Sequence, residues 1–78
     1  MDLQKVEVGL RIKTIKLHST KGMIIKSHHL EVRKAGVEGV VKGYVPGHGG
    51  DVWWVEHDDG KVGAYCFNEF KPAKKVKL

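Results

Sequence analysis

Apolar and polar residues alternate in two stretches of the first half of the chain. Residues 10–17, LRIKTIKL, switch repeatedly between apolar and charged side chains, and residues 30–34, LEVRK, repeat the pattern. Such alternation is typical of a strand with one buried face. The β-branched run at 23–26, MIIK, follows turn-forming residues at 18–22, HSTKG. The sequence therefore predicts an N-terminal hairpin over residues 10–26 and a further short strand, LEVRK.

Turn residues divide the second half of the chain into short strands. Strand-like segments alternate with loops in this order: GVEGVVKGY (36–44), the loop VPGHGG, DVWWVEH (51–57), the turn DDG, KVGAYCF (61–67) and the single turn FNEF. Glycines within a strand mark bulges or sharp coiling, by which a small sheet closes on itself. Frequent turn signals, and no helical pattern longer than one turn, predict an all-β barrel or sandwich of five or six antiparallel strands.

Two adjacent tryptophans, Trp53 and Trp54, lie in one of these strands. Neighbouring residues of a strand point to opposite faces, so the two indoles cannot share one. A two-residue turn at Asp59-Gly60 places Trp53 opposite Cys66 on an apolar inner face. The same turn pairs Trp54 with Tyr65 on the outer face. A three-residue loop with a bulge at the glycine is the alternative, and it shifts the partner strand without changing the face of either tryptophan.

The outer aromatic pair has two interpretations. The N-terminal strands or the C-terminal tail can fold over Trp54 and Tyr65, and Val52 on the same face favours such a cover. The pair can instead form a recognition platform, joined by Tyr44 near the glycine-rich loop. Exposed aromatic side chains on small barrels stack bases, clasp prolines or surround methylated cations.

The length of 78 residues predicts one domain over residues 1–78, with frayed ends at 1–9 and 74–78. No signal-like apolar run and no span of about 20 apolar residues occurs, so we expect a cytoplasmic protein without a membrane segment. Cys66 is the only cysteine, which excludes an intramolecular disulfide.

Positive charge is concentrated at the two ends of the chain. Residues 1–34 have eight lysines and arginines against three acids, residues 35–70 have two against six, and residues 71–78 have four lysines and no acid. A solvated surface accounts for this pattern as well as a basic stripe for a polyanion or an acidic partner protein does. Lysines outnumber arginines twelve to two, so any nucleic-acid binding should be weak and non-specific. The basic residues expected to contribute include Lys13, Lys16, Arg33 and Lys34.

No motif for catalysis or for a cofactor is recognisable. The five histidines lie at no spacing typical of a metal site. Asp58 and Asp59 belong to a turn, where aspartate caps its own backbone. Cys66 on an inner face behaves as a small hydrophobe, and PGHGG lacks the Lys-Ser/Thr and the helix of a phosphate loop. We therefore expect no catalytic residue, no metal and no cofactor, and a protein that is not an enzyme.

The stretch from His29 to Ala73 resembles the SH3-like barrel superfamily, which includes Tudor, KOW and related small bacterial domains. The resemblance rests on the order of LEVRK, GVEGVVKGY, the variable loop VPGHGG, WWVEHDDGKV and the one-turn element FNEF before the last strand. It implies a small barrel, to which the hairpin over residues 10–26 is an addition. Members bind proline-rich peptides, methylated lysine or arginine, nucleic acids or other proteins, so the resemblance implies binding without naming the ligand.

These features predict a non-enzymatic binding module. Its partner, a protein or a nucleic acid, should contact the exposed aromatic residues Trp54, Tyr65 and Tyr44 and the basic rim beside them. The alternative is a structural subunit or homodimer that buries the Trp54 face and the N-terminal hairpin against another chain, with no separate ligand.

Overall fold

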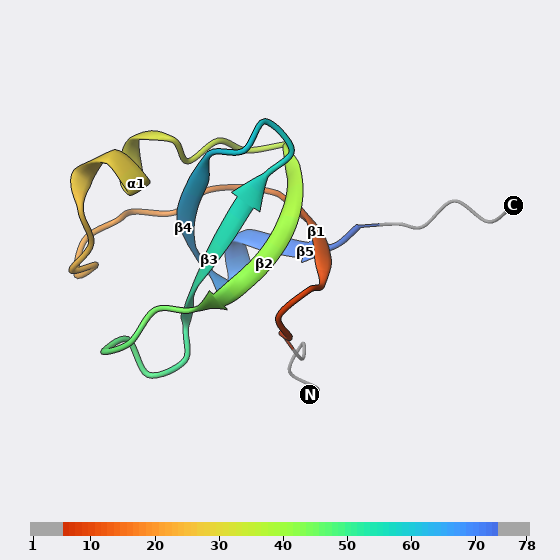
Figure 1. The fold of residues 1–78 in the computed structure, drawn as a ribbon. Coiled ribbons are helices and arrows are strands. Elements are labelled where there is room, and N and C mark those ends of the chain that lie inside the picture. Colours follow the sequence, from red (N-terminus) through yellow and green to blue (C-terminus); the bar gives the residue numbers. More distant parts are fainter. Residues whose placement is uncertain (1–5, 74–78) are drawn as a thin grey trace, which may run out of the picture.

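Five antiparallel strands form one coiled sheet in the computed structural model, which describes residues 6–73 (Figure 1). The strands are β1 (Arg11–Thr14), β2 (Glu38–Tyr44), β3 (Val52–His57), β4 (Val62–Cys66) and β5 (Phe70–Pro72). Their order in the sheet is β4-β3-β2-β1-β5. The short helix α1 (Ser27–Glu31) precedes β2, and the 3₁₀ turn η1 (Phe67–Glu69) joins the two edge strands. The all-β class predicted from the alternation is confirmed, and so is the single turn at FNEF.

The alternation in β1 corresponds to one buried and one solvent-facing side. Ile12 and Thr14 are buried, whereas Lys13 between them is exposed. The Thr14 hydroxyl donates a hydrogen bond to the Lys34 carbonyl oxygen at 2.7 Å and accepts one from the Val37 N–H at 2.9 Å. A buried polar side chain is tolerated when it is bonded in this way. Thr14 therefore fastens the chain just before β2 to the sheet.

The N-terminal hairpin expected over residues 10–26 does not form. β1 pairs with β2 on one side and with β5 on the other, and residues 23–26 are not in a strand. The strands β2 and β5 satisfy the backbone hydrogen-bonding groups on both edges of β1. In a lone hairpin one edge of this strand would stay unpaired. Residues 15–37 instead form one long connection, and LEVRK is the end of α1 followed by a turn rather than a strand.

The turn between β3 and β4 is the three-residue alternative. The Gly60 N–H donates to the His57 carbonyl oxygen, and the His57 N–H donates to the Lys61 carbonyl oxygen, both at 2.8 Å. Gly60 has a φ of 91°, which the bulged position of such a loop requires. The two-residue turn at Asp59-Gly60 is therefore wrong, and β4 is shifted by one residue against β3.

This shift changes the partner of each tryptophan. Trp53 lies opposite Tyr65, and Trp54 lies opposite Ala64. The predicted pairing of Trp54 with Tyr65 is wrong for this reason. The prediction that the two indoles lie on opposite faces of the sheet is confirmed. Trp53 packs against the buried cluster that contains Val55, and Trp54 packs against the one that contains Val52.

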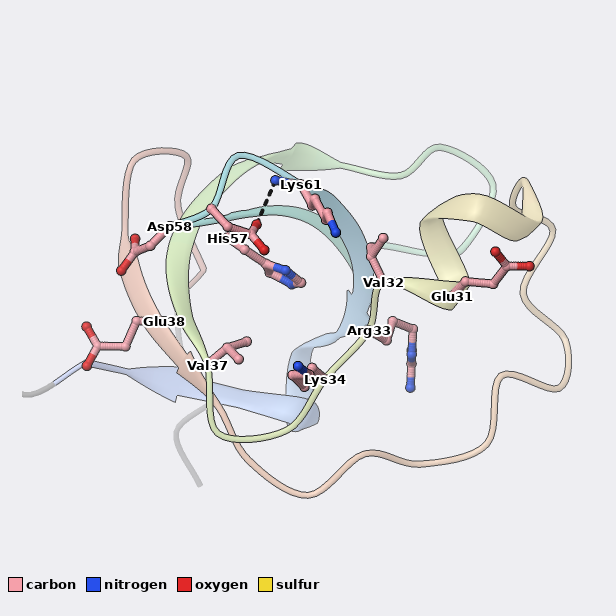
Figure 2. Close-up of a pocket in the computed structure, with 10 residues that line it drawn as sticks. Glu31, Val32, Arg33, Lys34, Val37, Glu38, His57, Asp58 and Lys61 are labelled. Carbon is pink, nitrogen blue, oxygen red and sulfur yellow. Dashed lines mark hydrogen bonds between the residues drawn. The ribbon is translucent and has the colours of Figure 1, made fainter.

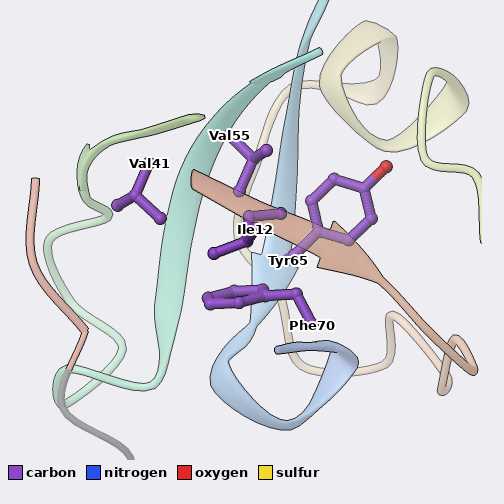
Figure 3. Close-up of a cluster of buried hydrophobic side chains, with 5 residues drawn as sticks. All are labelled: Ile12, Val41, Val55, Tyr65 and Phe70. Carbon is purple, nitrogen blue, oxygen red and sulfur yellow. The ribbon is translucent and has the colours of Figure 1, made fainter. Parts of the chain in front are cut away.

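Buried side chains form one cluster on each face of the sheet. The inner cluster, inside the coil, consists of Ile12, Val41, Val55, Tyr65 and Phe70 (Figure 3). The outer cluster consists of Val45, Val52 and Ala64, with Met23, Ile25, Trp54 and Cys66 packed against it. β3 and β4 contribute to both clusters, so both of their faces are covered. This burial on both faces accounts for the unbroken apolar run VWWV at 52–55, because a strand with one solvent-exposed face would alternate with polar residues.

The glycines of β2 coincide with a bulge and with a close approach of two strands, as predicted. The register of β2 against β3 shifts between Val41 and Gly43, which marks a bulge. A Cβ atom on Gly39 would overlap the carbonyl oxygen of Glu56, so only glycine allows this close approach of the two strands.

Residues 6–9 are attached to the sheet, although the sequence analysis placed them in a frayed end. The Gly9 N–H donates to the Val41 carbonyl oxygen at 2.8 Å, and Val6 packs against the inner cluster. The other residues expected to fray, 1–5 and 74–78, lie outside the described residues. No helix within the described part of the chain is long and apolar enough to cross a membrane.

Candidate binding groove beside Trp54

A buried ion pair fixes the connection of residues 15–37 to the sheet. The Arg33 guanidinium donates two hydrogen bonds to the Glu69 carboxylate, from Nη1 to Oε1 at 3.0 Å and from Nη2 to Oε2 at 2.7 Å. Their side chains are only 3% and 0% exposed. Arg33 also donates to the carbonyl oxygens of Ala64 and His18, at 3.1 and 3.0 Å. Arg33 is thus a structural clamp, and its predicted place in a basic rim is wrong, because a buried charge is bound by its counter-ion.

Backbone groups satisfy the remaining acceptor positions of Glu69. The Cys66 N–H donates to Oε1 at 2.8 Å, and the His18 N–H donates to Oε2 at 2.7 Å. Each carboxylate oxygen therefore accepts two hydrogen bonds: Oε2 from the connection alone, and Oε1 from the connection and from the end of β4. A polar network bonded in this way specifies one arrangement of the parts that it joins.

Trp54 is half-buried under this connection. The His29 ring lies edge-on to the indole, with 4.9 Å between ring centroids, and Met23 and Ile25 pack in the same cluster. The His29 Nδ1 atom lies 2.8 Å from the Val62 carbonyl oxygen, which fixes the ring beside the indole. The interpretation in which N-terminal residues fold over the outer face is thus confirmed for part of the indole, although the covering residues are a loop and a helical turn instead of strands.

Tyr65 is fully buried in the inner cluster, so its predicted exposure on the outer face is wrong. Its hydroxyl lies 2.7 Å from His57 Nε2 and accepts a hydrogen bond from the Lys34 N–H at 2.8 Å. The one-residue shift of β4 placed this ring on the inner face. Burial raises the pKa of the Tyr65 hydroxyl, which therefore stays protonated near neutral pH.

A shallow apolar groove remains beside the covered part of Trp54. Its volume is about 300 Å³, and it is lined by Ile24, Ile25, Lys26, His29, Val45 and Trp54. Ile24 is 86% exposed, the highest value among the large apolar residues described. The groove therefore joins a half-buried indole to an apolar side chain that has almost no cover from the rest of the described chain.

One hydrogen-bonded bridge joins the two walls of this groove. The Ile24 N–H donates to His48 Nε2 at 3.1 Å, and His48 Nδ1 lies 3.1 Å from the Pro46 carbonyl oxygen. The connection and the loop between β2 and β3 are thus fixed against each other. These contacts within the chain fix the two walls of the groove relative to each other.

Tyr44 lies away from the groove. It is 59% exposed, and it pairs with Trp53, on the face opposite to that of Trp54. The Tyr44 and Trp53 rings meet edge-on with 5.9 Å between centroids, and Trp53 Nε1 donates to the Gly50 carbonyl oxygen at 3.0 Å. The structure therefore does not bring Trp54, Tyr65 and Tyr44 together into one platform.

The three predicted lysines are exposed but lie in separate places. Lys13 in β1 is opposite Lys71 in β5, and Lys16 follows the end of β1. Lys34 lies at the rim of a second hollow, at one open end of the coiled sheet (Figure 2). Within residues 6–73 neither these three lysines nor Lys71 forms an ion pair.

The second hollow has a mixed lining. Its volume is about 490 Å³, and Figure 2 shows His57 directed into the coil between Val32 and Val37. Charged residues of both signs surround these three: Glu31, Arg33, Lys34, Glu38, Asp58, Asp59 and Lys61. Burial lowers the pKa of His57, so the imidazole is neutral at pH 7, and its Nε2 is already bonded to Tyr65. Because charges of both signs surround it, this hollow favours neither an anionic nor a cationic ligand.

Neither a metal centre nor an activated nucleophile is formed by the described residues. No three His, Cys, Asp or Glu side chains within residues 6–73 converge on one point. Burial and the nearby Glu69 carboxylate raise the pKa of the Cys66 thiol, which is therefore protonated and weakly nucleophilic at neutral pH.

Comparisons of the chain with models of protein families, with curated proteins and with solved structures found no match.

The sequence analysis identified Trp54 but missed the residues that surround it. Ile24 and His29 lie beside the indole on the connection between β1 and β2, and His48, in the loop between β2 and β3, bonds to the Ile24 N–H. No alternation in the sequence encodes these contacts between separate segments. The signal that was present is the apolar pair Ile24-Ile25 next to a glycine and a methionine, in a segment with weak strand character.

Proposed function

We propose that this protein is a non-catalytic binding module that docks an extended segment of a partner protein in the groove beside Trp54. The observation that carries the proposal is the position of Ile24, 86% exposed at the edge of a groove lined by a half-buried indole. Apolar grooves with an aromatic anchor are typical of peptide-recognition sites, because partner side chains bury the exposed apolar surface.

The rigidity of the groove supports this proposal. Arg33 and Glu69 fix one wall to the sheet, and His48 fixes that wall to the other. A groove formed before the ligand arrives loses little conformational entropy on binding, which favours affinity in so small a site. The coiled five-stranded sheet and the 3₁₀ turn before β5 also support the resemblance to SH3-like barrels, many of which bind peptides.

Selection from a phage-displayed library of random nonapeptides tests the proposal. We expect enriched peptides that bind the wild-type chain and lose at least tenfold in affinity for Ile24→Glu. Ile24 is exposed, so this variant should keep its stability within about 0.5 kcal/mol. Val8→Glu is the matched control, because Val8 is also an exposed apolar residue, at 66%. Absence of enriched peptides, or equal loss with both variants, would contradict the proposed function.

A second candidate function is weak nucleic-acid binding along β1 and β5. The specific observation is that Lys13 and Lys71 face each other across the two strands, where like charges repel and an anion between them is stabilised. We expect single-stranded DNA of 20 nucleotides to bind weakly at 20 mM salt and to dissociate at 200 mM. Lys13→Glu should weaken this binding, whereas Lys61→Glu, the same charge change elsewhere, should weaken it less. No binding at 20 mM salt would exclude this candidate.

A further inference from the structure

We infer that the partner segment in the Trp54 groove is acidic as well as apolar, with carboxylate side chains flanking the apolar residues that bury Ile24. This inference rests on the proposed function and adds the chemistry of the partner to it.

The first observation is the charge of the two groove walls. The connection has three lysines and one acid, Glu31, over residues 15–31, and the loop between β2 and β3, residues 45–51, has one acid, Asp51. Lys26 lines the groove itself, and it forms no ion pair within residues 6–73. A partner carboxylate beside Lys26 would therefore meet a cation that has no internal competitor among the described side chains.

The second observation is that the nearest acids along β3 and η1 are already engaged. Glu56 lies two residues from Trp54 on the same face, and its carboxylate is 3.5 Å from Lys42 Nζ. Glu69 is buried against Arg33. Glu31, at the end of α1, and Asp51, just before β3, are the exposed acids closest to the groove in sequence. Two exposed acids against the three lysines at 16, 21 and 26 leave a small positive balance around the groove, and Lys26 is the cation that lines the groove itself.

These charges should select among apolar segments rather than supply most of the affinity. Exposed charge pairs contribute little each and are screened by salt, whereas apolar burial against Ile24 and Trp54 is not screened. We expect each flanking carboxylate to change affinity about two- to fivefold at low salt. The preference for an acidic segment should therefore disappear at high salt, while binding itself persists.

Three phage-displayed libraries separate the chemistry of the partner from the existence of the site. Each library has random apolar positions between fixed flanks of aspartate, serine or lysine. We expect enrichment in the order aspartate, serine, lysine at 50 mM salt, and similar enrichment at 500 mM. Lys26→Glu should reverse the order. Lys61→Glu, which makes the same charge change outside the groove, should leave the order unchanged.

The outcomes distinguish this inference from the function on which it rests. Equal enrichment of the three libraries at low salt, or a preference for lysine flanks, would overturn the acidic partner while the groove remains a binding site. No enrichment in any library would overturn both. Two other occupants have their own signatures, and either would overturn the inference: light scattering that finds a dimer broken by Ile24→Glu, or an oligonucleotide that displaces the selected peptide.

Discussion

The two faces of β3 and β4 are covered in different ways. On the inner face, five side chains, one from each strand, are at most 1% exposed, because the coiled sheet closes on itself. On the outer face only three residues are buried, and the cover is a connection without strands. The inner side chains are shielded from solvent by the hydrogen-bonded strands of the coiled sheet. Trp54 is shielded by a loop that leaves Ile24 exposed to solvent.

This difference assigns separate roles to the two faces. The inner cluster supplies the apolar burial that stabilises so small a domain, and any ligand there would have to displace it. The outer cover is held by a polar clamp, Arg33 with Glu69, and by the packing of Met23 and Ile25 against the outer cluster. Binding sites are commonly built from loops fixed on a rigid scaffold, and this arrangement fits that rule.

Arg33→Ala should have the largest effect, because it leaves the Glu69 carboxylate buried without its partner. We expect a loss of about 3–5 kcal/mol in the free energy of unfolding, measured by urea denaturation. Arg33→Lys should lose less, since the ammonium keeps the charge but not the two-pronged geometry. Peptide binding in the groove should weaken in both variants in the same order. Wild-type stability of Arg33→Ala would show that the clamp does not hold the outer cover.

Truncation of one isoleucine on each face compares the two covers directly. Ile12→Ala removes a fully buried side chain of the inner cluster and should cost about 2–4 kcal/mol. Ile25→Ala removes a partly buried side chain of the outer cluster and should cost about 1 kcal/mol. Thermal melts of both variants measure the difference. A larger cost for Ile25→Ala would mean that the outer face, rather than the inner one, stabilises the fold.

The pH dependence of stability should depend on His57, at the open end of the inner face. Burial lowers its pKa, and the carboxylates of Asp58 and Asp59 oppose the shift more than Lys34 and Lys61 enhance it. Below the unfolded value, about 6.5, the unfolded chain therefore binds the proton first, and stability falls with falling pH.

His57→Gln tests this expectation, since the amide can still bond to the Tyr65 hydroxyl but cannot take up a proton. We expect the loss of melting temperature between pH 7.5 and 5 to be smaller in the variant than in the wild type. An unchanged loss would assign the pH dependence to other groups.

The inner half of the fold is more predictable from the sequence than the outer half. Alternation around Ile12 and the apolar run at 52–55 indicate strands, because burial on a sheet has a fixed period. The residues around Gly60 are compatible with two turn types, and the hydrogen bonds between His57, Gly60 and Lys61 identify the three-residue loop. That one-residue shift moved Tyr65 from a predicted binding surface into the core, since neighbouring strand positions face opposite ways.

The outer half depends on contacts between distant parts of the chain. Arg33 looked like a surface cation because its partner, Glu69, is 36 residues away, and no local pattern links the two. The residues of LEVRK alternate as a strand does, but this clamp and the helical turn of α1 take precedence over their strand character. Ile24 lies outside any helix or strand, so no periodic pattern in the sequence indicates which residues it contacts. Its place beside Trp54 follows from the path of the whole connection.

Titration of a selected peptide into ¹⁵N-labelled protein tests the central claim most directly, because each tryptophan reports on one face. The indole N–H signal of Trp54 should shift on binding, together with the amide of Ile24. The indole signal of Trp53, bonded to Gly50 on the other face, should stay in place. A shift of the Trp53 signal with an unmoved Trp54 signal would place the binding surface on the wrong side of the sheet and contradict the account.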